Sequence, residues 1–281
     1  MSRYKGALPK LPERGYFKKG DKGPEVAKLQ RAVNWANGGR EQVVASLKVD
    51  EEYGPKTEEA VSFLEEIWGK TIDGEFGKVC RALIRDMDLT GAVRACNIGV
   101  AIAKNNKYTY GAGKRAHRSG CPFCGTNTGP RMKKKEKAGE PHVVKDSNGN
   151  GHTYANTLCC NTLITTCYAH GAKDPTILKI CKSGSCCGMQ PSEWTRSPNF
   201  KQVGTCKSVG YTKLKMGDVI MSDESKNGWC DHVWMYLGHG RFLVASGNDW
   251  SADSIASKPK AKQYYARYQK HKGCYVVRYT K

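Results

Sequence analysis

The sequence lacks any long apolar segment. Its 281 residues contain no uninterrupted apolar run approaching the about 18 residues that cross a bilayer. The opening residues, MSRYKGALPKLPERGY, are basic and contain proline, but they lack the apolar segment of a secretion signal. We therefore expect neither a membrane span nor a cleavable export signal. At about 100–200 residues per domain, the length predicts two domains, each with its own core.

The sequence also lacks an even number of cysteines. Thirteen cysteines occur in a chain for which we expect no export signal. An odd number cannot be fully paired within one chain, and disulfides form mainly in exported proteins. We therefore do not expect a fully paired disulfide framework. Free thiols, a metal site or a catalytic thiol are the alternatives that remain.

Acidic residues are scarce in one part of the chain only. Residues 1–90 contain 16 Lys and Arg against 15 Asp and Glu, which leaves 30 against 11 for residues 91–281. The first part is therefore nearly neutral, and the second is expected to attract a polyanion. Charge alone admits nucleic acid, anionic lipid and bacterial wall polymer equally.

Residues 15–90 contain helical patterns separated by Gly and Asp turns. GDKGPEVAKLQRAVNWANG places Val26, Leu29 and Val33 on one face, with Pro24 near the first turn. YGPKTEEAVSFLEEIWG and IDGEFGKVCRALIRDM repeat the same order of turn and helix. The first part of the chain is therefore predicted to form short helices around a small core.

These segments resemble the three-helix peptidoglycan-binding domain of bacterial and phage wall hydrolases. The resemblance rests on GDKGPEVAKLQ, LKVDEEYGPKTEEAV and TIDGEFGKVCRALI, in that order, over about 70 residues. It implies that residues 1–90 form a small three-helix bundle that binds peptidoglycan. The alternative is a generic helical bundle, because an apolar stripe at helical spacing is often only core.

Residues 91–281 have a different pattern. AVRACNIGVAIAKNNK predicts an opening helix, whereas HVWMYLG, RFLVAS and GCYVVRYTK have the apolar, aromatic and β-branched content of strands. Helices first and an antiparallel sheet afterwards predict the α+β class.

Two short segments carry residues suited to nucleophilic chemistry. In LCCNTLITTCYAHGA, the spacing predicts a helix that begins at Cys160. A helix N-terminus favours a thiolate, which is a competent nucleophile. His232 opens the predicted strand HVWMYLG after the GDVIM segment. A histidine at a strand start can face a helix N-terminus, as acyl transfer by a Cys/His pair requires.

The second part of the chain resembles the NlpC/P60 superfamily of cysteine peptidases and amidases, which includes the related CHAP domains. GDVIM, HVWMYLG and GRFLVAS match its turn and strands, and the helix pattern is matched by Cys160, Asn161, Leu163, Tyr168 and Gly171. The resemblance implies a papain-like domain over residues 91–281, with helices packed on an antiparallel sheet. It further implies Cys160 as nucleophile, His232 as base and no required cofactor.

The chain departs from the family pattern at two positions that concern the site. Cys159 stands where the family usually has Asp, so Cys159 is the alternative nucleophile. Val244 stands where the family often has the third polar residue, and it cannot orient an imidazole. Asn248 is the favoured substitute because its parity along a regular strand and turn matches that of His232, and Asp249 is the alternative.

An insertion over about residues 112–155 separates the KYTYGAG segment from the nucleophile. By the same resemblance, Tyr108 of KYTYGAG would line the substrate groove. Within the insertion, Cys121 and Cys124 have the spacing of one edge of a zinc site, although a turn, a redox-active pair or a disulfide pair is the preferred interpretation. The residues that could complete a zinc site are His117, His142, His152, Cys186 and Cys187. The basic run 131–137 is expected to help adsorption to anionic polymer.

Together the resemblances imply a bacterial peptidoglycan hydrolase. Without an export signal it resembles a phage endolysin, made in the host cytoplasm and acting on the cell wall, and we expect a monomer without a specific nucleic-acid partner. Anionic wall polymers are additional candidate partners. The alternatives are a bacterial or mobile-element autolysin, a catalytically inactive wall-binding protein and a basic nucleic-acid-binding protein. The bond cleaved is left open: a peptide bond of the stem, or its amide link to the glycan.

Overall fold

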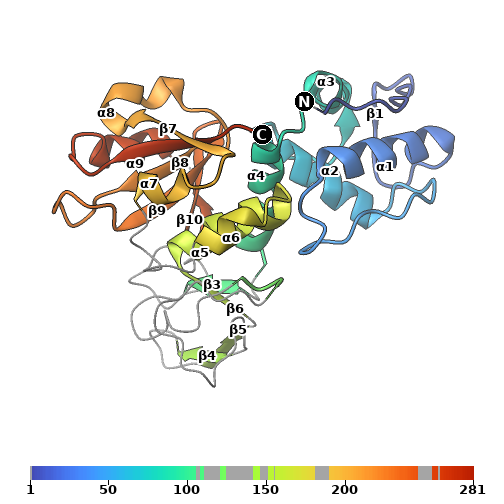
Figure 1. Ribbon diagram of the computed structural model, residues 1–281. Helices are drawn as coiled ribbons and strands as arrows, with labels where there is room; N and C mark the ends of the chain where they lie inside the picture. The colour runs from blue at the N-terminus through green and yellow to red at the C-terminus, as the bar shows by residue number, and fades with distance from the viewer. Residues whose placement is uncertain are drawn as a thin grey trace. The chain divides into compact units, whose positions relative to one another are not determined.

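The computed structural model divides the chain into two compact units, residues 1–90 and 91–281 (Figure 1). The residues that it describes are 2–105, 108–110, 121–124, 142–145, 151–154, 156–180, 190–245, 255–258 and 260–281. Across these ranges no helix has the length and apolar character needed to cross a membrane.

Unit 1 is built from helices and one short strand pair. Its helices are α1 (Pro24–Ala36), α2 (Pro55–Ile67) and α3 (Lys78–Asp86). Strand β1 (Tyr16–Phe17) pairs antiparallel with β2 (Phe76–Gly77). Both α1 and α2 begin with proline, which suits the first helical turn because no intrahelical partner exists there for an N–H group.

The predicted apolar faces of unit 1 meet in one core. Val26, Leu29 and Val33 of α1 are fully buried and pack with Ala60 and Leu64 of α2. Tyr53, Phe76, Cys80 and Ile84 complete the centre of the same cluster. The helices expected from the sequence are confirmed, because their spacing of 3–4 residues places each apolar side chain on the shared side.

Unit 2 contains a six-stranded sheet in the order β11-β10-β9-β8-β12-β7. Every adjacent pair in it is antiparallel. The strands are β7 (Phe200–Thr205), β8 (Val219–Ser222), β9 (His232–Gly238), β10 (Arg241–Ala245), β11 (Ile255–Lys258) and β12 (Tyr275–Tyr279). Helices combined with this antiparallel sheet confirm the α+β class predicted from the sequence.

Helices cover both faces of this sheet. On one face, α8 (Cys206–Val209) and α9 (Ala261–Tyr268) pack on a buried cluster that includes Trp234 and Phe242. On the other, α4 (Gly91–Ala103) and α5 (Cys160–Thr166) pack against β10, and α5 also packs against β9. Because strand side chains alternate, Met235 and Leu243 lie on this second face, close to α4.

The helix that begins at Cys160 changes its winding before it ends. It is α-helical only to Thr166 and continues as the π-helical turn η2 (Cys167–Gly171). A Cβ placed on Gly171 would lie 2.5 Å from the Arg94 carbonyl oxygen and 2.7 Å from Ile98 Cγ2. Glycine at this position therefore allows η2 to approach α4 closely.

The remaining elements of unit 2 are short. They are β3 (Tyr108–Tyr110), β4 (His142–Lys145), β5 (Gly151–Tyr154), β6 (Asn156–Leu158), α6 (Thr176–Ile180), α7 (Pro191–Trp194) and the 3₁₀ turn η4 (Tyr211–Lys213). Strand β3 pairs parallel with β6, and β4 pairs antiparallel with β5. This parallel pair places Tyr108–Tyr110 beside β6, the strand that leads directly into α5.

Parts of the predicted insertion lie outside the described residues. These are the basic run 131–137 and the candidate zinc ligand His117. Cys186 and Cys187 also lie outside them, as do the side chains of His142 and His152.

Candidate active site

The two adjacent thiols occupy the start of α5. Cys160 is the first helical residue, as predicted, and Cys159 is the N-cap in an extended conformation. Both side chains are fully buried. The Cys159 Sγ accepts a hydrogen bond from the Thr162 N–H at 3.5 Å and lies 3.1 Å from Thr162 Oγ1. An N–H donor and the helix dipole both stabilise negative charge on this sulfur.

His232 is the first residue of β9 and is buried. It lies opposite Ser222 in the register of β8 and β9. Within the described part of the chain, neither the His232 Nε2 nor the Ser222 Oγ has a hydrogen-bond partner. Buried polar atoms are normally paired, so an unpartnered ring nitrogen is available to accept a proton.

Burial lowers the pKa of His232 from its ordinary value, because desolvation disfavours the imidazolium. The negative charges of Glu224 and Asp231, and that of the Cys159 sulfur when it is ionised, act in the opposite direction. The Glu224 Oε1 lies 3.9 Å from His232 Nε2, too far for a hydrogen bond but close enough for charge interaction. Neutral imidazole, the form that a general base needs, is thereby favoured near neutral pH.

The charge interaction links His232 to Cys159, the alternative nucleophile. By strand alternation His232 lies on the same side of β9 as Trp234, which packs under α8 and α9. Helix α5 packs against β9, and Cys159 precedes its first turn. His232 is the first residue of β9, and a charge on the Cys159 sulfur would raise its pKa.

The acidic residues beside His232 were not anticipated from the sequence. Glu224 and Asp231 belong to the loop between β8 and β9, and the Asp231 carboxylate accepts the N–H groups of Glu224 and Ser225 at 2.7 and 2.9 Å. Glu224 also accepts the Tyr264 hydroxyl at 3.2 Å. The only signal in the sequence was the acidic spacing of SDESKNGWCDH.

Of the remaining predicted site residues, the structure describes Tyr108 but not Asn248 or Asp249. Asn248 and Asp249, the candidates for orienting the imidazole, lie outside the described residues. Tyr108 is 8% exposed in β3, and its ring centroid is 6.2 Å from that of Phe123. Burial raises the pKa of Tyr108, and the nearby Cys121 adds to the effect.

A second thiol–imidazole contact was not anticipated from the sequence. The Cys121 Sγ lies 3.0 Å from the Nε2 of His170 in η2. Cys121, Cys124 and His170 form a group whose potential metal-binding atoms all lie within 4.8 Å of one another. Burial raises the pKa of Cys121 to about 11 and lowers that of His170. A possible metal-binding group is therefore present, with His170 as a member that sequence spacing did not suggest.

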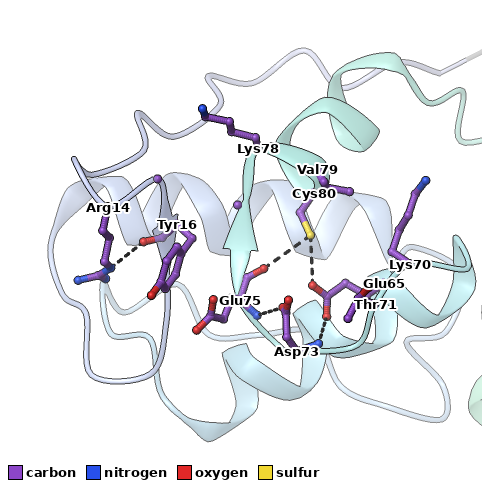
Figure 2. Close-up of a pocket in the computed structure, with 12 residues that line it drawn as sticks. Arg14, Tyr16, Glu65, Lys70, Thr71, Asp73, Glu75, Lys78, Val79 and Cys80 are labelled. Carbon is purple, nitrogen blue, oxygen red and sulfur yellow. Dashed lines mark hydrogen bonds between the residues drawn. The ribbon is translucent and has the colours of Figure 1, made fainter.

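Unit 1 has a separate pocket of about 490 Å³. Figure 2 shows the charged side chains of Arg14, Lys70 and Lys78 around it, with the Tyr16 ring at one side and Glu65 opposite. Glu65 Oε2 accepts the N–H groups of Asp73 and Gly74 at 3.2 and 3.0 Å. Burial raises the pKa of Glu65 to about 7. The pocket thus offers donors, acceptors and an aromatic side chain to a polar ligand.

Comparisons with known proteins found no matching family model, no matching curated protein and no matching solved structure.

Proposed function

We propose that the protein hydrolyses an amide bond of bacterial peptidoglycan, with unit 2 as the catalytic unit. The observation that carries the proposal is the buried His232: its Nε2 has no hydrogen-bond partner among the described residues, and it opens the strand β9, against which the thiol-bearing helix α5 packs. An imidazole interacting with a thiol on a helix N-terminus is the arrangement used for acyl transfer. The proposed fold of unit 2 is papain-like, with helices packed on an antiparallel sheet.

In the proposed reaction, the thiolate at the start of α5 attacks the amide carbonyl carbon. The imidazolium of His232, formed when it takes the thiol proton, gives that proton to the leaving amine as the C–N bond breaks. His232 then takes a proton from water, which attacks the thioester and releases the acid and the thiol. Backbone N–H groups at the helix start would stabilise the oxyanion. This sequence of steps requires no cofactor.

Cys160 is the proposed nucleophile, and Cys159 is the second candidate. The start of α5 at Cys160 and the N-cap role of Cys159 support the first assignment, because the Cys159 sulfur already accepts the Thr162 N–H. The effect of a Cys159 charge on the pKa of His232 supports Cys159 as the alternative. Asn248, with Asp249 as its alternative, is proposed to fix the imidazole tautomer.

Unit 1 is proposed to be a three-helix peptidoglycan-binding domain. Its pocket supports this role, because the charged side chains around it and the Thr71 hydroxyl can bind the peptide or hydroxyl groups of a wall fragment. Arg14 and Lys18 lie over the Tyr16 ring at 5.4 and 6.0 Å. Of the wall hydrolases, a phage endolysin made in the host cytoplasm is the proposed type, acting as a monomer.

The test is clearing of purified peptidoglycan by the full chain. We expect the turbidity of a wall suspension to fall in the presence of the protein, and alkylation of its thiols to abolish the effect. His232→Gln should be as inactive as the alkylated protein, whereas His271→Gln should clear normally. Absence of clearing by the unmodified protein on walls of several chemotypes would reject the hydrolase proposal.

A further inference from the structure

The turn Cys121–Cys124 resembles half of a metal site in its local geometry. The backbone N–H groups of Phe123 and Cys124 act to lower the pKa of Cys121, against the larger effect of burial. Such N–H donors stabilise a metal-bound thiolate and orient it. Two cysteines separated by two residues can then present both sulfurs to one ion.

His170 supplies a third donor from a distant part of the chain. Its Nε2 faces the Cys121 Sγ, and its ring packs edge-on against Phe123 with centroids 5.1 Å apart at 71°. Zinc–sulfur bonds of about 2.3 Å and zinc–nitrogen bonds of about 2.0–2.1 Å place neighbouring ligand atoms of a tetrahedral site about 3.5–3.8 Å apart. The separations here, 3.0 Å for one pair and at most 4.8 Å for the others, are close to that range.

The position of His170 indicates what such an ion would do. It lies in η2, about 15 Å along the helix from Cys160 at about 1.5 Å per residue, so the ion would not reach the proposed reacting atoms. It would instead join the Cys121–Cys124 turn to the helix that begins with the two thiols. A link between residues 49 positions apart closes a long loop, which is where a cross-link removes most chain entropy.

We propose that Cys121, Cys124 and His170 bind a structural zinc ion, which anchors the inserted segment to the end of the α5–η2 helix. Binding releases the two thiol protons and uses the neutral imidazole Nε2. Water or a further side chain takes the fourth position of the tetrahedron. The inference does not depend on the reaction proposed for unit 2.

The test measures metal content in the full chain, expressed with zinc in the medium and purified without chelator. We expect about one zinc per chain in the unmodified protein, and less than about a fifth of that in Cys124→Ser and in His170→Gln. Cys124 is exposed, so its replacement should leave the core intact. The control His271→Gln, which removes a histidine outside the proposed site, should retain the zinc.

Two further readouts separate ligand loss from misfolding. Removal of zinc by EDTA should lower the melting temperature of unit 2 in the unmodified protein but not in Cys124→Ser. Cobalt substitution should give a thiolate-to-metal charge-transfer band that both variants lose. Zinc-free protein with reduced thiols, a Cys121–Cys124 disulfide in its mass spectrum, or full zinc content in His170→Gln would each overturn the proposal.

Discussion

Burial and nearby charge control the proposed chemistry at the scale of single residues. Desolvation lowers the pKa of His232, while the charges of Glu224 and Asp231, and of Cys159 when it is ionised, act to raise it. A general base must be neutral to take the thiol proton, so burial favours the form in which His232 begins the proposed reaction.

Serine substitution of each thiol at the start of α5 separates the two candidate nucleophiles. If Cys160 is the nucleophile, Cys160→Ser should lower the rate of wall hydrolysis by about 10³-fold or more. Cys159→Ser should then retain most activity, because serine is a good N-cap and can accept the Thr162 N–H. Initial rates of peptide release measure both variants, with His271→Gln as control. The reverse result would assign the nucleophile to Cys159.

The pKa of His232 should lie below the ordinary histidine value of about 6.5, because burial is the largest influence on it. Glu224→Gln removes a negative charge that favours the imidazolium, so it should lower this pKa further. An NMR titration of the ring, assigned through His232→Gln, provides the measurement. Glu13→Gln in unit 1 should leave the titration unchanged. A midpoint above 6.5, or no response to Glu224→Gln, would contradict the described electrostatics.

At the scale of elements, the α5–η2 helix connects the main features of unit 2. Its start holds the two thiols, and its end holds His170 beside Cys121. Between these ends it packs on α4 and on the central strands. A change in its packing should therefore affect both the proposed active site and the proposed zinc site.

Gly171→Ala should destabilise unit 2 by about 1–3 kcal/mol, because the added methyl group overlaps the Arg94 carbonyl. For a unit of this size, each kcal/mol corresponds to about 2–4 °C in melting temperature. Differential scanning calorimetry of the full chain measures the shift. The transition of unit 1 provides the internal control and should not move. An unchanged unit 2 transition would show that η2 can move away from α4 at little cost.

Several helices and strands could be predicted because a short run of residues is enough to show the spacing typical of each. The spacing of Val26, Leu29 and Val33 indicates α1, and the aromatic and β-branched run after His232 indicates β9. The π-helical turn after Thr166 and the strand β7 were not predicted; β7 is mostly exposed and has no clear alternation.

Parts of the candidate site could not be predicted because they depend on contacts distant in sequence. His170 meets Cys121 across 49 positions, and no spacing rule connects a lone histidine to a CxxC pair over that distance. Glu224 reaches His232 only because β8 and β9 form a hairpin. Cys160 and His232, by contrast, were predicted at the starts of their helix and strand because each start has a recognisable local pattern.

At the scale of the whole molecule, the two units differ in charge. Unit 1 is nearly neutral, and unit 2 carries 30 basic against 11 acidic residues. Unit 1 should therefore recognise its ligand by shape and hydrogen bonds, while unit 2 contributes a nonspecific attraction to anionic polymer.

This division predicts different salt responses for the separated units. A 1–90 fragment should bind purified walls almost independently of salt, whereas a 91–281 fragment should dissociate as salt rises. Screening explains the difference, because the Debye length falls from about 10 Å at 0.1 M to about 3 Å at 1 M. Co-sedimentation with walls across a salt series measures both. Salt-resistant binding by the 91–281 fragment, with no binding by the 1–90 fragment, would show that unit 1 is not the wall-binding unit.

Mass spectrometry of the fragments released from purified peptidoglycan tests the central claim most directly. The unmodified protein should release fragments with new amino termini on stem residues, or intact stems separated from the glycan. Cys159→Ser/Cys160→Ser, in which neither thiol is available, should release neither while still binding the walls. Fragments cut only between sugars, or equal amide cleavage by the double variant, would contradict hydrolysis by a thiol of α5.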